Sequence, residues 1–428
     1  GIAVSVAIAS GTGTLNGPPT QATDANGRAT FTGLSITGLA GAFTLQFTGA
    51  GLTGVTSTAV NLVAGPAARL AITTPPPATV QSGIAMAPAT VVQLQDASGN
   101  AVSTSGTNIV AALVSGGGTL TGTLTVATVA GGASTFSNLV LTGTIGPRTI
   151  RFTSGGLAPD TSAVITLAAG NAAAVAFVQE PSVVTAGAAI TPSPSVRVQD
   201  GAGNLVTAPA QTVVLSISTN PGGATLSGTT SVATVSGLAT FPGLSLNRSG
   251  TGYRLRAVAG ALVPDTSVVF NVSAAAATTI AANSLTTQSD TAGLPAAAPP
   301  SVLVTDANGN PVAGVSVTFA VTGGGGSVLP VTPVVTNAAG IATLTSWTLG
   351  NAAGANTVTA SVVGLTGSPV SFTATGVAGA ATQLVIQTQP SGAAQSGVAF
   401  AVQPAVRLAD VFGNTVPTTG TVVTAALA

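Results

Sequence analysis

The sequence predicts an all-β protein, a tandem array of β-sandwich domains joined end to end in a linear rod. Three observations lead to this fold. The chain repeats itself with a period of about 105 residues, polar and apolar residues alternate within each repeat, and turns rich in Gly and Asn separate the alternating runs. A solenoid coil takes only roughly 20–50 residues, so this period indicates one whole domain per repeat.

Three motifs fix the period and keep their order along the chain. The motif Asp-x-x-Gly-Asn begins at residues spaced by 104, 106 and 104 positions, namely Asp96, Asp200, Asp306 and Asp410. A turn glycine followed by Ala-Thr-Phe or a variant recurs as NGRATF (26–31), GGASTF (131–136), SGLATF (236–241) and AGIATL (339–344). An Ala-rich motif recurs as VAGPAARLAI (63–72), AAGNAAAVAF (168–177), SAAAATTIAA (273–282) and VAGAATQLVI (377–386).

The phase of these motifs divides the chain into five segments. Residues 1–65 are the rear part of a repeat, residues 66–170, 171–275 and 276–379 are full repeats, and residues 380–428 are the front part of another. The two end segments each lack half of a sandwich, which leaves unpaired strand edges. We therefore expect them to be completed end to end, by adjoining repeats of a longer chain or by another copy of this one.

Alternation within a repeat gives the strands and their buried faces. Val315, Val317, Phe319 and Val321 alternate with small or polar residues, so one side faces a core and the other faces water. One valine lies four residues before each motif Asp, which predicts equivalent core positions at Val92, Val196, Val302 and Val406. The stretch Gly1–Ala9 aligns with Gly420–Ala428, and both match the strand predicted at Gly106–Val114.

Composition excludes several classes of function. Only 4% of residues are charged, against about 25% in an ordinary soluble domain, and the net charge is zero. This removes the electrostatic basis for binding nucleic acid or an anionic membrane. The sequence contains no run of about 20 apolar residues, which a membrane-spanning helix would need. Because Cys, His and Lys are absent, the sequence offers no catalytic constellation, and we expect neither an enzyme nor a cofactor.

The segment TDANGNPVAGVSVTFAVTGGGG (305–326), followed by TNAAGIATLTSW (336–347), resembles the bacterial immunoglobulin-like domain of the invasin and intimin type. The resemblance covers nearly all of residues 276–379. The other repeats keep Asp-x-x-Gly-Asn but lose the Pro-Val and the Phe, so they are more distant relatives. The resemblance implies an immunoglobulin-like sandwich that serves as a spacer on a cell-surface protein.

The four motif aspartates, Asp96, Asp200, Asp306 and Asp410, are weak metal candidates. Asp and Asn are oxygen ligands for Ca²⁺, but the ion takes six to eight oxygens and each turn offers one carboxylate. Turn chemistry explains them better, since Asp accepts hydrogen bonds from nearby amides and Gly adopts a positive φ.

Other residues at equivalent positions have structural interpretations. We expect Asp160 and Asp265 to cap turns, and Arg151 and Arg256 to be exposed on strand faces and to block edge pairing, with ligand contact as the alternative for the arginines. The single Trp347 and Tyr253 are expected in cores rather than in a sugar platform. Two sites fit the glycosylation sequon, a weak signal: Asn247-Arg-Ser249 and Asn271-Val-Ser273.

These observations favour a non-catalytic, extracellular or cell-surface stalk or fibre, with copies of itself as end-to-end partners. Low charge also favours lateral self-association, because like-charge repulsion is almost absent. Two alternatives stay open. The repeats could form an adhesin that binds a glycan or a cell-surface protein, or an accessory array of a secreted enzyme.

Overall fold

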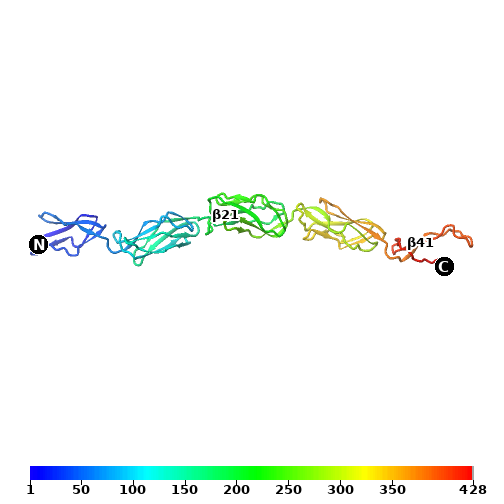
Figure 1. The fold of residues 1–428 in the computed structure, drawn as a ribbon, viewed down its shortest axis with the longest axis horizontal. Helices are drawn as coiled ribbons and strands as arrows, with labels where there is room; N and C mark the ends of the chain where they lie inside the picture. Colours follow the sequence, from blue (N-terminus) through cyan, green and yellow to red (C-terminus); the bar gives the residue numbers. More distant parts are fainter. Residues whose placement is uncertain (427–428) are drawn as a thin grey trace.

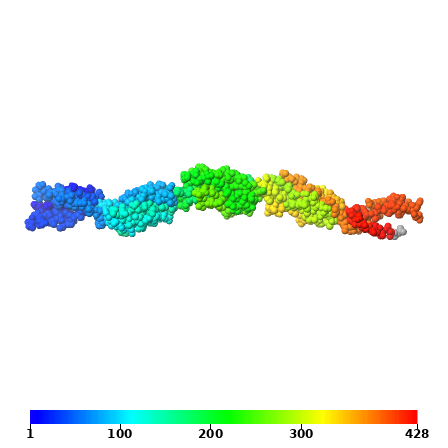
Figure 2. Space-filling view, viewed as in Figure 1, coloured from blue at the N-terminus to red at the C-terminus, as the bar shows by residue number. Residues whose placement is uncertain are grey.

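The computed structural model describes residues 1–426 and forms an elongated row of β-sandwiches (Figure 1). All regular elements among these residues are strands. The N-terminal and C-terminal segments lie at opposite ends of the row, and narrow waists separate the repeats in the space-filling view (Figure 2). Within the described residues, no helix is long and apolar enough to cross a membrane.

The first full repeat pairs a three-stranded sheet, β14-β10-β8, with a larger sheet, β13-β11-β16-β18-β9, and adds a two-stranded sheet, β12-β15. Strand β17 pairs with β16, and β9 runs parallel to β18. The strands are β8 (Arg69–Thr74), β9 (Thr79–Gln81), β10 (Thr90–Gln95), β11 (Asn108–Ser115), β12 (Thr119–Thr121), β13 (Thr125–Ala127), β14 (Ala133–Phe136), β15 (Val140–Thr142), β16 (Gly146–Thr153), β17 (Asp160–Thr161) and β18 (Ile165–Ala168).

The second full repeat has the same topology, with sheets β19-β21-β25 and β20-β29-β27-β22-β24, a two-stranded sheet β23-β26, and β28 beside β27. Its strands are β19 (Ala174–Gln179), β20 (Val184–Thr185), β21 (Ser195–Gln199), β22 (Thr212–Thr219), β23 (Leu226–Ser227), β24 (Ser231–Ala233), β25 (Leu238–Thr240), β26 (Ser245–Leu246), β27 (Gly250–Val258), β28 (Asp265–Thr266) and β29 (Phe270–Ser273).

The third full repeat consists of sheets β30-β32-β36 and β31-β39-β38-β33-β35 with a two-stranded sheet, β34-β37. Its strands are β30 (Ala277–Ala282), β31 (Thr287–Thr291), β32 (Ser301–Asp306), β33 (Ser316–Gly323), β34 (Gly326–Leu329), β35 (Val334–Val335), β36 (Ile341–Thr343), β37 (Ser346–Leu349), β38 (Gly354–Ser361) and β39 (Val370–Val377). The predicted all-β fold of tandem sandwiches is therefore confirmed.

The end segments hold fewer strands. The N-terminal segment contains β1 (Ala3–Ser10), β2 (Gly13–Asn16), β3 (Thr20–Ala22), β4 (Ser35–Gly38), β5 (Gly41–Gly49), β6 (Val55–Thr56) and β7 (Val60–Leu62). The C-terminal segment, through residue 426, contains only the hairpin of β40 (Gln383–Thr388) and β41 (Ala405–Ala409). Completion of these two segments by an adjoining repeat stays a prediction.

Each full repeat encloses its own apolar core. The predicted register is confirmed at Val92, Val196 and Val302, which are fully buried. It is wrong at Val406, whose side chain is 43% exposed, because the hairpin β40-β41 has no second sheet above it in the described residues.

The strand predicted at Gly420–Ala428 is also wrong, because residues 420–426 have irregular backbone. Residues 427 and 428 lie outside the described range. The equivalent strands β1 and β11 pair with β5 and β16, and the C-terminal segment provides no such partner through residue 426.

Separate cores predict local responses to core mutations. Val302→Ala removes two buried methyl groups and should lower the free energy of unfolding of the third repeat by about 2 kcal/mol. Trp347 is the only Trp and lies in this core, so its fluorescence during urea unfolding reports on this repeat. The matched control Val92→Ala, in the first full repeat, should leave the Trp347 transition unchanged. An equal shift with both variants would show that the repeats share one cooperative unit.

Candidate functional site at the interdomain junctions

The Asp-x-x-Gly-Asn motif first builds a tight turn. In the second full repeat, Asp200 Oδ1 accepts hydrogen bonds from the backbone amides of Ala202 and Asn204, both at 2.9 Å. Gly203 adopts φ 83°, a conformation that favours glycine. The predicted turn chemistry is therefore present, and it uses only one of the two carboxylate oxygens.

The second carboxylate oxygen binds the linker that precedes the repeat. Asp200 Oδ2 accepts hydrogen bonds from the backbone amide of Gly170 at 2.7 Å and from the side-chain amide of Asn204 at 2.9 Å. The linker amide is equivalent at all four motifs, where the donors are Gly65, Gly170, Ala275 and Gly379. The aspartate thus fixes the chain at the point where one repeat passes into the next.

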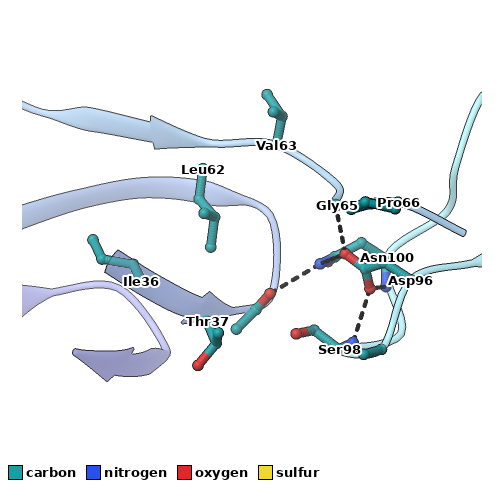
Figure 3. A pocket seen from close by; sticks show the side chains of 11 residues that line it. Ile36, Thr37, Leu62, Val63, Gly65, Pro66, Asp96, Ser98 and Asn100 are labelled. Carbon is teal, nitrogen blue, oxygen red and sulfur yellow. Dashed lines mark hydrogen bonds between the residues drawn. The ribbon is translucent and has the colours of Figure 1, made fainter. Parts of the chain in front are cut away.

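The motif asparagine crosses to the preceding repeat. Asn204 Oδ1 accepts from the backbone amide of Ile145 at 2.9 Å, and Asn204 Nδ2 donates to the Gly143 carbonyl at 2.8 Å. The same pair of bonds, 2.7–3.0 Å long, recurs at the other motifs between Asn100 and Gly38/Ala40, Asn310 and Asn247/Ser249, and Asn414 and Asn351/Ala353. Figure 3 shows the first of these junctions, where the Asn100 side chain bonds to the preceding repeat and lies beside Asp96 of its own motif.

We call this arrangement the junction clasp: the motif Asp and Asn, the linker amide, and the loop of the preceding repeat that receives the Asn, termed the receiving loop. Four copies occupy the four boundaries, and the motif Asp is at most 6% exposed in each. Sequence reasoning found the motif but assigned it to a turn within one repeat. Its cross-junction partners were missed because they are backbone atoms, which leave no signature in the side chains.

The clasp holds its carboxylates in the charged form. Hydrogen bonding by the Asn100 side chain lowers the pKa of Asp96 from 3.8 to about 2, against the opposing effect of burial. At the other three motifs burial would raise the pKa of the Asp, but the motif Asn and the surrounding backbone amides outweigh it and lower the pKa. The negative charge is thus stabilised by N–H donors.

A side chain beneath the receiving loop supports it by a hydrogen bond at three of the four junctions. The supporting position is buried and lies under a Gly-rich turn. It directly precedes the residue at which strand pairing resumes after a β-bulge. It is occupied by Phe43, Arg148, Tyr253 or Asn356 in the successive repeats. Arg148 Nη2 donates to the Thr144 carbonyl, and the Tyr253 hydroxyl donates to the Arg248 carbonyl at 2.9 Å. Asn356 Oδ1 accepts from the Gly350 amide at 2.8 Å. Four different side chains occupy this position, so no residue pattern marked it in the sequence.

A metal ion at the clasp would compete with these donors. Each motif carboxylate already accepts four N–H hydrogen bonds, as for Asp306 from Asn308, Asn310 (backbone and side chain) and Ala275. A cation needs oxygen lone pairs, which these protons occupy. Among residues 1–426, no three Asp or Glu side chains are grouped as a metal site would require.

The paired residues outside the clasp have structural surroundings. Asp160 Oδ2 accepts from the Ile72 amide and Asp265 Oδ2 from the Phe177 amide, both at 2.8 Å, so each ties a short strand to the first strand of its repeat rather than only capping a turn. The third repeat uses Ser368 at this turn, where it accepts from the Val362 amide.

Arg151 and Arg256 are exposed, as predicted, but the expectation that they block edge pairing is wrong. Both lie in central strands with partners on either side, β16 and β27. Trp347 and Tyr253 are fully buried, which confirms core packing. The sequon residues Asn247 and Asn271 each accept a backbone hydrogen bond, from Thr225 and Gly252.

Comparison with known proteins identifies one domain. Residues 296–375 match the model of the bacterial Ig-like domain (group 1) family, so the third full repeat contains such a domain. No curated protein matches the chain.

Solved structures similar to the chain are tandem all-β proteins of low identity. They include the protocadherin GammaB4 extracellular domain (14% identity, TM-score 0.34, 87% of this chain and 60% of that one). Domains 4–9 of the surface layer protein SbsC are also similar (15% identity, TM-score 0.21, 91% of this chain and 69% of that one). So is invasin, a bacterial integrin-binding protein (16% identity, TM-score 0.27, 90% of this chain and 75% of that one). This chain spans less than two thirds of the protocadherin structure.

The cross-junction bonds predict that the motif Asn controls orientation. Asn310→Ala leaves the Ser249 amide and the Asn247 carbonyl without partners and should broaden the distribution of angles between the second and third full repeats in electron micrographs. Asn337→Ala is the control, because Asn337 caps a turn of the third repeat through the Ala339 and Ile341 amides and makes no cross-junction bond. Equal broadening in both variants would contradict the clasp.

The saturated carboxylates predict independence from calcium. Thermal unfolding in millimolar CaCl₂ and in excess EDTA should give coinciding midpoints, because no carboxylate lone pair is free for the ion. A midpoint that falls markedly in EDTA would refute this account of the motif.

The lowered pKa values predict acid resistance with a sharp limit. A folded pKa below the unfolded value means that the clasps contribute fully above about pH 4 and lose this contribution as pH falls through about 2, the value for Asp96. The maximum particle dimension from X-ray scattering should hold from pH 7 to pH 4 and change near pH 2. A control in about 1 M salt at pH 7 should show no change, because salt screens exposed charges far more than buried ones. A change between pH 7 and pH 5 would contradict the assignment.

Proposed function

We propose that this chain is a non-catalytic structural stalk or fibre shaft at a bacterial cell surface, in which the clasps keep successive domains in line. One observation carries the proposal: the same Asp–Asn clasp, with the same backbone partners, recurs at all four boundaries. A flexible string of domains would not require the same cross-junction hydrogen bonds at every linker.

The chemistry of the chain supports this role. Each full repeat has its own core, so the array grows by adding units that contact only their neighbours. The bacterial Ig-like match in residues 296–375 agrees with a bacterial surface location. Low charge and zero net charge leave little repulsion between shafts, so we also propose that copies associate side by side at high concentration.

The adhesive alternative has less support. A glycan platform usually needs exposed aromatic rings, and both Trp347 and Tyr253 are buried. Among the described residues the exposed large aromatic side chains are Phe400 and Phe412, both in the C-terminal segment. The accessory role in a secreted enzyme would depend on a catalytic domain elsewhere in the parent protein.

Electron microscopy of dilute protein tests the stalk. Strands of about eight residues at ~3.3 Å each, with loops, give about 35–45 Å per repeat, so particles should be straight rods of roughly 150 Å. A variant with all four motif asparagines changed to Ala (Asn100, Asn204, Asn310 and Asn414) should give bent particles of the same contour length. Native particles as bent as this variant would refute the proposal.

A further inference from the structure

The third residue of the motif differs at every junction, as Ser98, Ala202, Asn308 and Phe412. In the two junctions where it is large, it lies over a glycine turn of the preceding repeat. The turn glycines Gly83, Gly187 and Gly293 are equivalent, since their amides bond to Leu141, Leu246 and Gly350 and each has a φ between 76° and 79°. This contact is separate from the clasp, which uses the receiving loop and the linker.

The junction between the second and third full repeats has the contact in polar form. A methyl group placed on Gly187 would lie 3.0 Å from Asn308 Nδ2, so the amide side chain covers the glycine. Arg248, in the receiving loop, adds a hydrogen bond from Nη1 to the Asn308 carbonyl at 3.1 Å. Two interactions therefore join the third motif residue to the preceding repeat here.

The last junction has the contact in apolar form. The ring of Phe412 lies against Gly293, where any side chain would overlap the ring, and Asn351 Oδ1 lies close to the same glycine. Glycine at this turn is therefore needed for the approach of the next domain as well as for its positive φ.

The junction between the first and second full repeats lacks this contact. Ala202 has only a methyl group, and nothing lies within 4 Å of the place where Gly83 would carry a side chain. An open groove of about 350 Å³ is left there, lined by residues that include Ile84, Asn171 and Ala202. The clasp itself is intact at this junction, with the bonds of Asp200 and Asn204 described above.

We infer that the third motif residue grades the stiffness of the shaft, and that, among the three junctions that follow a full repeat, the one near residue 170 bends most. Attachments at the linker and the receiving loop define an axis about which one domain can still rotate. A third contact, as Asn308 and Phe412 provide over a glycine turn, restricts this rotation. This inference rests on the proposed stalk function and deepens it, since it says which of these three junctions bends most easily.

Paired spin labels on the full chain test the grading, because the protein has no Cys to interfere. Val129→Cys with Val235→Cys spans the junction near residue 170, and Val235→Cys with Val331→Cys spans the next one; all three side chains are exposed. The distance distribution should be wider for the first pair. Ala202→Asn should narrow the first distribution, and Arg248→Ala with Asn308→Ala should widen the second to match the native first.

Controls separate this inference from the stalk proposal. Ala307→Asn adds an amide at an exposed neighbouring position and should change neither distribution. Unchanged Trp347 fluorescence confirms that the third repeat of each variant is folded. Equal, narrow native distributions that ignore the substitutions would overturn the grading and leave the stalk intact. Broad distributions at both junctions, unaffected by Asn204→Ala or Asn310→Ala, would overturn both.

Discussion

A buried aspartate that must be fully hydrogen-bonded underlies the whole array. An unpaired carboxylate in such a place is costly, so each motif Asp collects four N–H donors. Those donors come from its own turn, from the motif Asn and from the linker. The Asn can serve the carboxylate and the preceding repeat at once only when the two domains are docked. The local need to stabilise this buried charge therefore determines how neighbouring domains contact each other.

The constancy of the period follows from this geometry. The Asp and its linker donor are separated by 30 or 31 residues at every junction, since the intervening strand pair must bring them back together. Insertions there would pull the linker amide from the carboxylate. Variation is tolerated beneath the receiving loop, where Arg148 and Tyr253 do the same work with different chemistry. The backbone contacts of the clasp are therefore the same at every junction, whereas the supporting side chains differ.

Much of the fold could be predicted from sequence because its signals are local and periodic. Val92, Val196 and Val302 were placed by alternation and by their distance from the motif Asp. Val406 shares that pattern and is exposed, because burial also requires a second sheet that the pattern does not contain. Only part of the clasp could be predicted. Asp200 marks the turn in the sequence, but the hydrogen-bond partners of the Asn204 side chain are the Gly143 carbonyl and the Ile145 amide. These backbone groups lie about sixty positions away and have no side-chain signature. Long-range backbone partners, donors and acceptors alike, become apparent only in three dimensions.

Amide hydrogen exchange at Ile145 tests the central claim most directly. This residue lies in an exposed loop with its side chain 58% exposed, so its amide should exchange rapidly unless Asn204 of the next repeat accepts it. The account predicts slow exchange in the native chain and fast exchange in Asn204→Ala, while the Ile150 amide, bonded to Ser162 within the same repeat, stays protected in both. Fast exchange at Ile145 in the native chain, with Ile150 protected, would show that the junction is open and the clasp does not form.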